Sequence, residues 1–312
     1  MSERWLWTQK EDIGPPPRFG HVMEYEAARQ RAVLFSGYMS GGVTPTDTWE
    51  WDGDAWTQVA DIGPFGRYWA SMAYDDSRQR LVLFGGVGVV GASWQRLVDT
   101  WEWNGAEWTQ VADIGPLGRL GSCMAYDTVR QRTVLFGGDV LEPTPGYSNE
   151  TWEWDGTEWT QIDDTGPPGR AYAAMVFNRE RECLVLSGGG VVVGSNWQPL
   201  GDTWEWGAET GWVQRQDVGP RSWDSPNMVY TAEHTVLVGT PPSRTGAVQT
   251  WEWDSRLWTQ RQDMGPLARD STVLTYDSQR DRVVLFGGQL SQIGAVSFPL
   301  LGDTWELAIT EQ

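Results

Sequence analysis

The chain has 312 residues, and its 42 acidic and 23 basic residues give a formal net charge of −19 at pH 7. A surface this acidic repels phosphate backbones and anionic lipids, so we expect neither nucleic acid nor a membrane as a partner. No apolar run approaches the ~18 residues of a membrane span, and the N-terminal residues contain no apolar signal segment. Cys123 and Cys183 are the only cysteines, which favours buried thiols in a reducing, cytoplasmic compartment.

The predicted elements follow a repeat of about 50 residues. Each copy is anchored by Gly-Pro-x-x-Arg or a variant of it, and the anchors begin at Gly14, Gly63, Gly115, Gly166, Gly219 and Gly265. Each anchor precedes four short apolar or alternating runs, such as "ASMAYD", "LVLFGG", "DTWEW" and "EWTQ" in the second copy. Gly, Pro, Asn and Asp separate these runs, so the pattern predicts four strands, a to d, in each of six repeats.

The two ends of the chain are complementary. Residues 4–9, "RWLWTQ", read as a strand d with no strand c before it, whereas the sixth repeat stops after its strand c at "DTWELAITEQ". A ring of sheets would otherwise keep an unpaired edge. We therefore predict that Trp5–Gln9 forms the outermost strand of the sixth repeat.

Four antiparallel strands repeated six times predict an all-β, six-bladed propeller that forms one domain over residues 1–312. The predicted blades cover about 18–60, 67–112, 119–163, 170–216, 223–262, and 269–309 together with 5–9. The sequence resembles the kelch-repeat family through the diglycines that end strand b and the Trp pairs of strands c and d. These are Gly85–Gly86, Gly137–Gly138, Gly188–Gly189 and Gly287–Gly288, with Trp51/Trp56, Trp103/Trp108, Trp154/Trp159, Trp206/Trp212 and Trp253/Trp258. The resemblance implies a kelch-type propeller.

The chain contains 22 tryptophans, and 17 of them recur at repeat positions in strands c and d, where we expect them to pack between sheets. Others lie in the b–c loops or at the start of strand a. In an up-and-down sheet these connections emerge at one end, which we call the loop face; the a–b and c–d turns form the opposite turn face. The b–c loops are long and dissimilar, so we predict that ligand binding uses the loop face. The candidates are Phe19, Tyr68, Trp69, Trp94, Tyr172, Trp197, Trp223 and Phe298.

Polar residues also vary along strand a. Asp224 and Asp270 occupy one aligned position in neighbouring repeats, and His21 belongs to the next repeat around the ring. Carboxylates and an imidazole at one mouth could act as general acid and base. Alternatively, each could hydrogen-bond the backbone or an anchor arginine. We expect those repeated arginines to pair within the ring with the repeated glutamates of strand c, such as Glu50.

The leading hypothesis is a monomeric, non-catalytic binding propeller that recognises a peptide, a partner protein or a small ligand at the loop face, with no metal or cofactor. The first alternative is an enzyme of the isomerase, lyase or cyclase type acting on a small apolar or sugar-like substrate at the channel mouth. In that case Asp224, Asp270 or His21 would be catalytic, and the propeller would resemble the sialate mutarotases. The second alternative is a lectin similar to six-bladed fucose-binding lectins, with an exposed Arg/Glu/Trp sugar site in each repeat.

Overall fold

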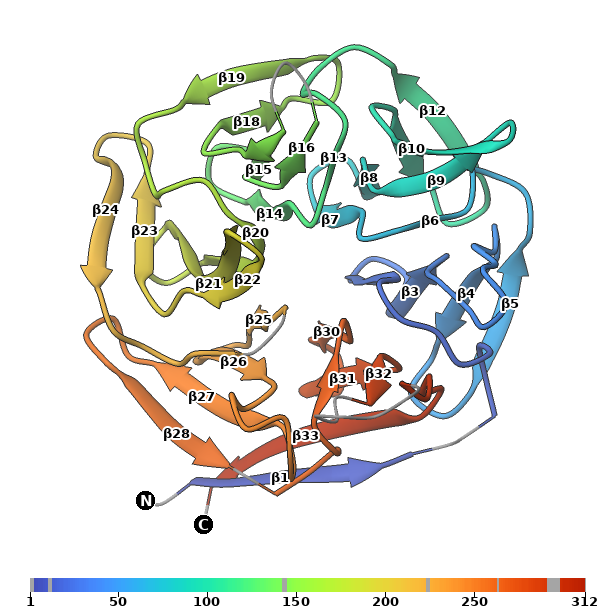
Figure 1. Ribbon diagram of the computed structural model, residues 1–312. Coiled ribbons are helices and arrows are strands. Elements are labelled where there is room, and N and C mark those ends of the chain that lie inside the picture. Colours follow the sequence, from blue (N-terminus) through green and yellow to red (C-terminus); the bar gives the residue numbers. More distant parts are fainter. Residues whose placement is uncertain are drawn as a thin grey trace.

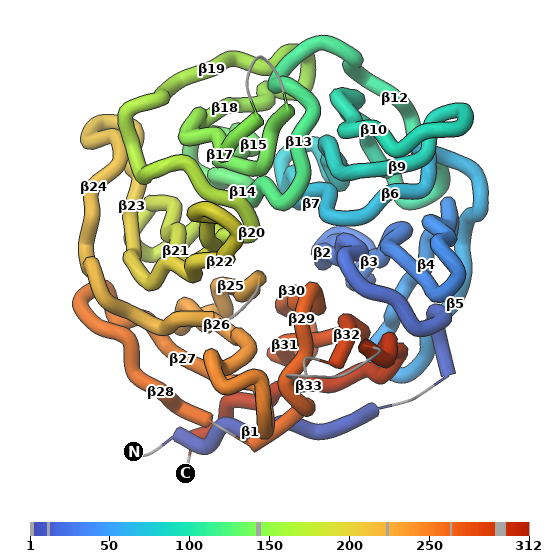
Figure 2. The backbone as a smooth tube through the Cα atoms, in the orientation of Figure 1, coloured from blue at the N-terminus to red at the C-terminus, as the bar shows by residue number. Residues whose placement is uncertain are grey.

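The computed structural model describes residues 3–10, 13–141, 145–222, 225–262, 264–290 and 298–311. Within these ranges the chain is all-β, and none of it forms a helix long and apolar enough to cross a membrane. Six antiparallel sheets, each with at least four strands, surround a central axis like the blades of a propeller (Figure 1). The tube in Figure 2 follows the same order of sheets around the ring.

In each sheet four main strands follow one another along the chain from the axis outward. The closing sheet is the exception, because its outer strand comes from the N-terminal end of the chain. The inner strands are β2 (Val22–Glu26), β7 (Ser71–Asp75), β14 (Cys123–Asp127), β20 (Ala171–Asn178), β25 (Asn227–Tyr230) and β30 (Val273–Asp277). The second strands are β3 (Arg31–Phe35), β8 (Arg80–Phe84), β15 (Arg132–Phe136), β21 (Cys183–Val193), β26 (Thr235–Gly239) and β31 (Arg282–Phe286). The third strands are β4 (Thr48–Trp51), β11 (Thr100–Trp103), β18 (Thr151–Trp154), β23 (Thr203–Gly207), β27 (Gln249–Trp253) and β33 (Thr304–Glu311). The outer strands are β5 (Trp56–Ala60), β12 (Trp108–Ala112), β19 (Trp159–Asp163), β24 (Gly211–Gln216), β28 (Trp258–Gln262) and β1 (Glu3–Gln9).

The b–c connections and the segments just before strand a contain short strands of their own, which the sequence pattern did not predict. These are β6 (Arg67–Tyr68), β9 (Val87–Val90), β10 (Ser93–Arg96), β13 (Arg119–Leu120), β16 (Asp139–Val140), β17 (Gly146–Tyr147), β22 (Asn196–Pro199), β29 (Arg269–Asp270) and β32 (Gln289–Leu290). β9 and β10 form a hairpin that pairs with β6, and β22 folds back on the extended β21. Small sheets therefore form part of the described loop face.

The N-terminal strand closes the ring. β1 pairs antiparallel with β33 from Glu3 opposite Glu311 to Gln9 opposite Trp305, and the two chain ends lie side by side in Figure 1. Trp7 is buried, and its Nε1 donates to the Thr250 hydroxyl of the neighbouring sheet at 3.1 Å. This pairing confirms the predicted closure.

The core lies between adjacent sheets, as expected for tryptophans that recur in every repeat. One cluster joins Val22 and Phe35 of the first sheet to Leu83 and Trp103 of the second, and further clusters fill the other interfaces. Every strand-d tryptophan also donates its Nε1 to a threonine of the preceding sheet. These pairs are Trp7–Thr250, Trp56–Thr304, Trp108–Thr48, Trp159–Thr100, Trp212–Thr151 and Trp258–Thr203.

The anchor arginines pair within the ring, but with partners other than those expected. Arg67 donates to both carboxylate oxygens of Asp99, just before strand c, and to the Gly85 carbonyl. The equivalent pairs are Arg18–Asp47, Arg119–Glu150, Arg170–Asp202 and Arg269–Asp303. The strand-c glutamates instead bind arginines of the a–b turns, as in Arg29–Glu50. The fifth repeat has neither the anchor arginine nor its acidic partner: Trp223 and Gln249 stand at these positions. The joint loss avoids a lone buried charge, which would be costly.

Candidate functional site

Aromatic rings from three repeats form a continuous row on the loop face. Trp94 on β10 contacts Tyr68 on β6 with ring centroids 5.6 Å apart, and Tyr68 lies 4.6 Å from Trp69. Trp69 meets Tyr172 on β20 at 5.4 Å, and Tyr172 meets Trp197 on β22 at 5.8 Å. These five side chains, which the sequence singled out, therefore lie together.

Two further rings widen the row at one end. Phe19 lies 5.9 Å from Trp69 and 6.1 Å from Tyr68. Tyr38, which follows strand b of the first repeat, lies 5.2 Å from both Phe19 and Tyr68. Sequence reasoning missed Tyr38, although it is an aromatic residue directly inside a b–c loop. We call the seven residues Phe19, Tyr38, Tyr68, Trp69, Trp94, Tyr172 and Trp197 the aromatic row.

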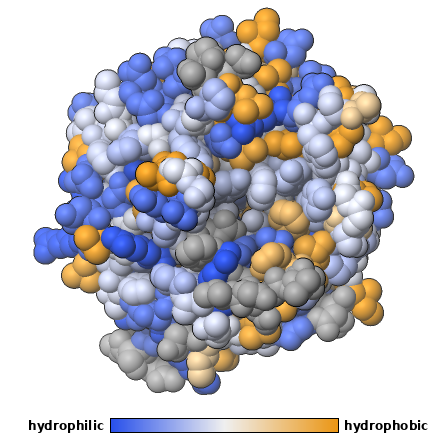
Figure 3. All heavy atoms as spheres, viewed as in Figure 1, coloured by the Kyte–Doolittle hydropathy of each residue, from blue (hydrophilic) through white to orange (hydrophobic). Residues whose placement is uncertain are grey.

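The aromatic row is partly open to solvent. Trp94 is 46% exposed and the other six side chains are half-buried. Figure 3 views this face, and many described residues around its centre are pale, the tint of intermediate hydropathy. Burial raises the pKa of the Tyr68 phenol, with the nearby Tyr38 adding to the effect, so Tyr68 stays neutral at physiological pH. The row thus offers ring faces and phenol hydroxyls but no formal charge.

Trp69 and Tyr172 occupy left-handed backbone positions that favour glycine, although the sixth repeat has Ser271 there with a φ of 52°. Both have left-handed φ values, 54° and 60°, and the equivalent residues in the first and third repeats are Gly20 and Gly121. A backbone hydrogen-bond chain fixes this conformation, because Trp69 N donates to the Gly20 carbonyl and Tyr172 N to the Gly121 carbonyl. A left-handed conformation costs a bulky residue ~1 kcal/mol or more. The chain therefore retains two large rings at the mouth in spite of a backbone penalty.

The two glycines also provide the space for these rings. A Cβ atom on Gly20 would approach Trp69 Cδ1 to 3.0 Å, and one on Gly121 would approach Tyr172 Cδ1 to 2.8 Å. Trp69 Nε1 extends further and donates to the Ser271 hydroxyl at 3.2 Å. Residues of the first, third and sixth repeats therefore contact the two central rings.

Polar contacts between neighbouring b–c connections hold the rim in place. Arg96 on β10 donates to Asp139 on β16 at 2.8 Å. The Tyr147 hydroxyl on β17 accepts a hydrogen bond from Val192 N on β21 at 3.1 Å. These contacts fix the hairpins that carry Trp94 and Trp197.

The remaining predicted ligand-binding residues lie outside the aromatic row or outside the described residues. Phe298 is 45% exposed and makes no ring contact with a described residue of the row. Trp223 is not among the described residues.

Two of the three predicted acid/base residues, His21 and Asp270, are described, and both are buried. His21 is buried with its ring edge against Phe286 at 5.4 Å, and neither ring nitrogen has hydrogen-bond geometry with a described residue. Burial and the Arg18 charge lower the pKa of His21 to about 3. Asp270 is also buried, with Arg244 Nη2 3.6 Å from its Oδ2. Asp224 lies outside the described residues.

One group of side chains has donor atoms close enough for a metal ion. His234 Nδ1 lies 2.6 Å from Glu252 and its Nε2 lies 3.3 Å from Glu3 on the closing strand. Arg261 also contacts Glu252. In the other repeats an arginine of the a–b turn pairs with the strand-c glutamate, so His234 fills that structural position in the fifth repeat.

The exposed sugar site required by the lectin hypothesis is not formed by the repeat residues. Arg67 and Arg119 are fully buried at their side chains, and Trp51 and Trp103 are 1% exposed.

A cavity of about 650 Å³ occupies the central channel on the side of the turn face. Glu24 on β2 contributes to its wall. Sequence reasoning missed this residue, although an alignment of strand a would reveal it: the equivalent positions are Ala73, Ala125, Val176, Val229 and Thr275.

No model of a known protein family matches the sequence, and a comparison with curated proteins finds no relative. The chain is similar to a solved structure described as the structure of YjhT, with a TM-score of 0.73 and 14% sequence identity. The alignment covers 96% of this chain and 98% of that one. The similarity supports the β-propeller fold, and the resemblance to kelch repeats remains a prediction.

Proposed function

We propose that this propeller is a binding protein and that the aromatic row is the site at which it holds an extended segment of a partner protein. The observation that carries the proposal is the pair Trp69 and Tyr172, which keep large rings at left-handed backbone positions where two other repeats have glycine. Strained residues that the surrounding structure holds in place concentrate at functional sites.

The chemistry of the row favours a neutral, extended peptide. Tyr and Trp dominate the binding energy of protein interfaces because they bury much area with few rotatable bonds. Successive rings from Trp94 to Trp197 are 4.6–5.8 Å apart, so a peptide in an extended or polyproline conformation would meet a ring every residue or two. Proline and aromatic side chains fit such a surface best.

The exposure of the rings also supports binding. An aromatic cluster that only supported loops would be shielded from water, whereas Trp94 is 46% exposed and the rest of the row is half-buried. The small sheets around it hold Trp94 and Trp197 in place before binding, which lowers the entropy cost of association.

Selection from a random-peptide phage library tests this proposal. The Trp69→Gly/Tyr172→Gly variant serves for counter-selection because glycine suits the backbone at both positions. Selected peptides should contain proline or aromatic residues. Their affinity, measured by fluorescence anisotropy, should fall roughly 30-fold, about 2 kcal/mol, in Trp94→Ala or Trp197→Ala.

Leu257→Ala is the matched control, because Leu257 is 48% exposed in a c–d turn on the opposite face. It should leave the affinity unchanged. Failure to enrich any peptide over the counter-selection variant, or equal binding by Trp94→Ala and wild type, would rule out this site.

A further inference from the structure

The cavity in the central channel is separate from the aromatic row and has a different chemistry. Its wall is formed by the second halves of the inner strands and by the a–b turns. Met124, Met175, Met228 and Leu274 form an apolar ring, followed toward the turn face by aromatic residues such as Phe177. Its volume of about 650 Å³ lies within the range of sites for small organic molecules.

Glu24 places a carboxylate within this apolar wall. Among the described lining residues it is the one acidic side chain contributed by an inner strand. The corresponding positions of the other repeats carry alanine, valine or threonine. The propeller scaffold therefore does not require an acidic group at this position.

Two hydrogen bonds hold the carboxylate of Glu24 in place, but they do not fully compensate for its burial. Its Oε1 accepts hydrogen bonds from Tyr25 N at 3.2 Å and from the Thr275 hydroxyl at 3.5 Å. Oε2 accepts none from a described residue, and the side chain is half-buried at the cavity wall. Burial raises the pKa of Glu24 to about 7, which these two hydrogen bonds only partly offset. A cation in the channel would supply the missing partner.

The charges at the entrance of the cavity also favour a positively charged ligand. Asp76, Arg179 and Glu180 line its outer end, and all three are exposed. The net charge of the whole chain, −19, strengthens the attraction for cations.

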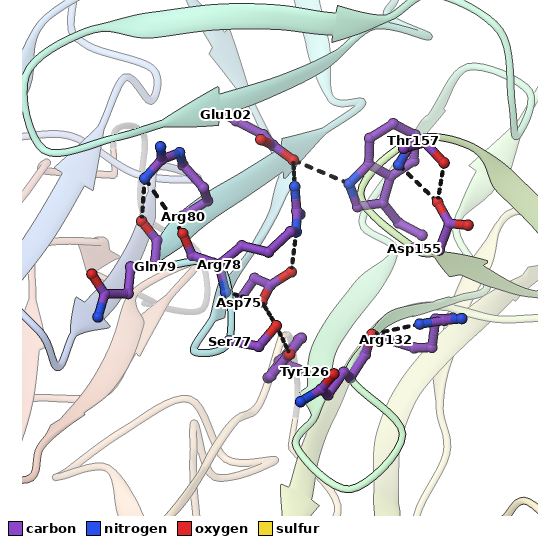
Figure 4. A network of polar contacts seen from close by, with 12 residues as sticks. Asp75, Ser77, Arg78, Gln79, Arg80, Glu102, Tyr126, Arg132, Asp155 and Thr157 are labelled. Atoms are coloured by element: carbon purple, nitrogen blue, oxygen red, sulfur yellow. Dashed lines mark hydrogen bonds and ion pairs between the residues drawn. The ribbon is translucent and has the colours of Figure 1, made fainter.

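Contacts between repeats hold this end of the channel. Tyr126 donates to the Ser77 hydroxyl at 2.8 Å, and Ser77 in turn donates to Asp75. Arg78 links Asp75 to Glu102, as Figure 4 shows. The cavity wall is therefore formed before any ligand enters.

We propose that the central channel binds a small organic amine, with the protonated nitrogen on Glu24 and the apolar part of the molecule against the methionine and aromatic rings. The ammonium group donates a charge-assisted hydrogen bond to Glu24 Oε2, and aromatic faces of the wall stabilise its charge further. This site does not depend on peptide binding at the loop face.

Isothermal titration calorimetry at neutral pH with phenethylamine tests the proposal, with phenethyl alcohol as the uncharged analogue. The amine should bind saturably and the alcohol roughly tenfold more weakly. Glu24→Gln should weaken amine binding roughly tenfold or more and make the two ligands nearly equal.

Two further variants make the result decisive. Glu24→Ala should fold, since alanine occupies this position in the second and third repeats, and it should also lose the preference for the amine. Glu158→Gln removes the same charge from an exposed c–d turn and should leave binding intact. Absence of saturable amine binding, or equal amine affinity in wild type and Glu24→Ala, would overturn the proposal.

Discussion

Replacing Trp7 with alanine tests the closure of the ring by the N-terminal strand. Trp7 is 7% exposed and packs in a cluster with Leu285 and Leu307 of its own sheet and Val238 of the neighbouring sheet. Its Nε1 also donates to Thr250. The variant therefore removes both an apolar contact and a hydrogen bond at the last interface of the ring.

The expected loss follows from these contacts. A buried tryptophan removes roughly 150–250 Å² from water, equivalent to roughly 4–6 kcal/mol of gross stabilisation at ~25 cal/mol/Å². Large-to-small core substitutions of tryptophan cost ~3–5 kcal/mol, and the hydrogen bond contributes ~1 kcal/mol. We expect Trp7→Ala to lower the free energy of unfolding by about 4 kcal/mol in urea titrations followed by circular dichroism.

Two controls bracket this value. Trp108→Ala removes the same kind of contact from an internal sheet, where Trp108 is 8% exposed and bonded to Thr48, and should cost a similar amount. Leu6→Ala alters an exposed residue of the same closing strand and should cost less than about 1 kcal/mol. A Trp7→Ala loss as small as that of Leu6→Ala, beside a large loss for Trp108→Ala, would refute the closure.

Two further predictions concern charged groups. The hydrogen bond to Glu252 raises the pKa of His234; its stabilising contribution is complete below the unfolded pKa of about 6.5 and is lost as pH rises through the higher folded value. Urea titrations from pH 6 to 9 should therefore show a decline in stability that is absent in His234→Gln, and identical pH profiles would contradict this assignment. Burial alone would raise the pKa of Asp99, but the hydrogen bonds and charge of Arg67 outweigh it and hold that pKa low. Asp99→Asn leaves the Arg67 guanidinium buried without its counter-charge and should cost about 3–5 kcal/mol in the same assay, whereas a change below 1 kcal/mol would show that the pair is dispensable.

The repeat made most of the fold predictable from the sequence. Six copies of one strand pattern fix which runs pair, and the incomplete first and last copies indicate the closing strand at Trp5–Gln9. The strands inside the b–c connections could not be predicted, because β9, β10 and β22 occur where the copies differ from one another. The partners of the anchor arginines were predicted wrongly because two acidic residues, Asp47 and Glu50, lie only three residues apart in the sequence. The anchor Arg18 pairs with Asp47 toward the loop face, whereas Glu50 pairs with Arg29 of the a–b turn on the opposite face.

The candidate site was predictable only in part. Off-pattern aromatics identified most of the aromatic row, since the loop face gathers residues from distant parts of the sequence. Tyr38 was not selected, although aromatic residues of other b–c loops, Trp94, Trp197 and Phe298, were. The channel carboxylate of Glu24 was missed because its aligned position was not compared between repeats, and the burial that raises its pKa is visible only in three dimensions.

The indole N–H resonances of the tryptophans provide the most direct test of binding at the loop face. After titration with a selected peptide, two-dimensional ¹⁵N–¹H spectra should show shifts for Trp69, Trp94 and Trp197. The resonances of Trp56 and Trp108, which are buried between sheets, should stay in place. Shifts confined to other tryptophans, with Trp94 and Trp197 unchanged by a saturating peptide, would contradict the assignment of the aromatic row as the binding site.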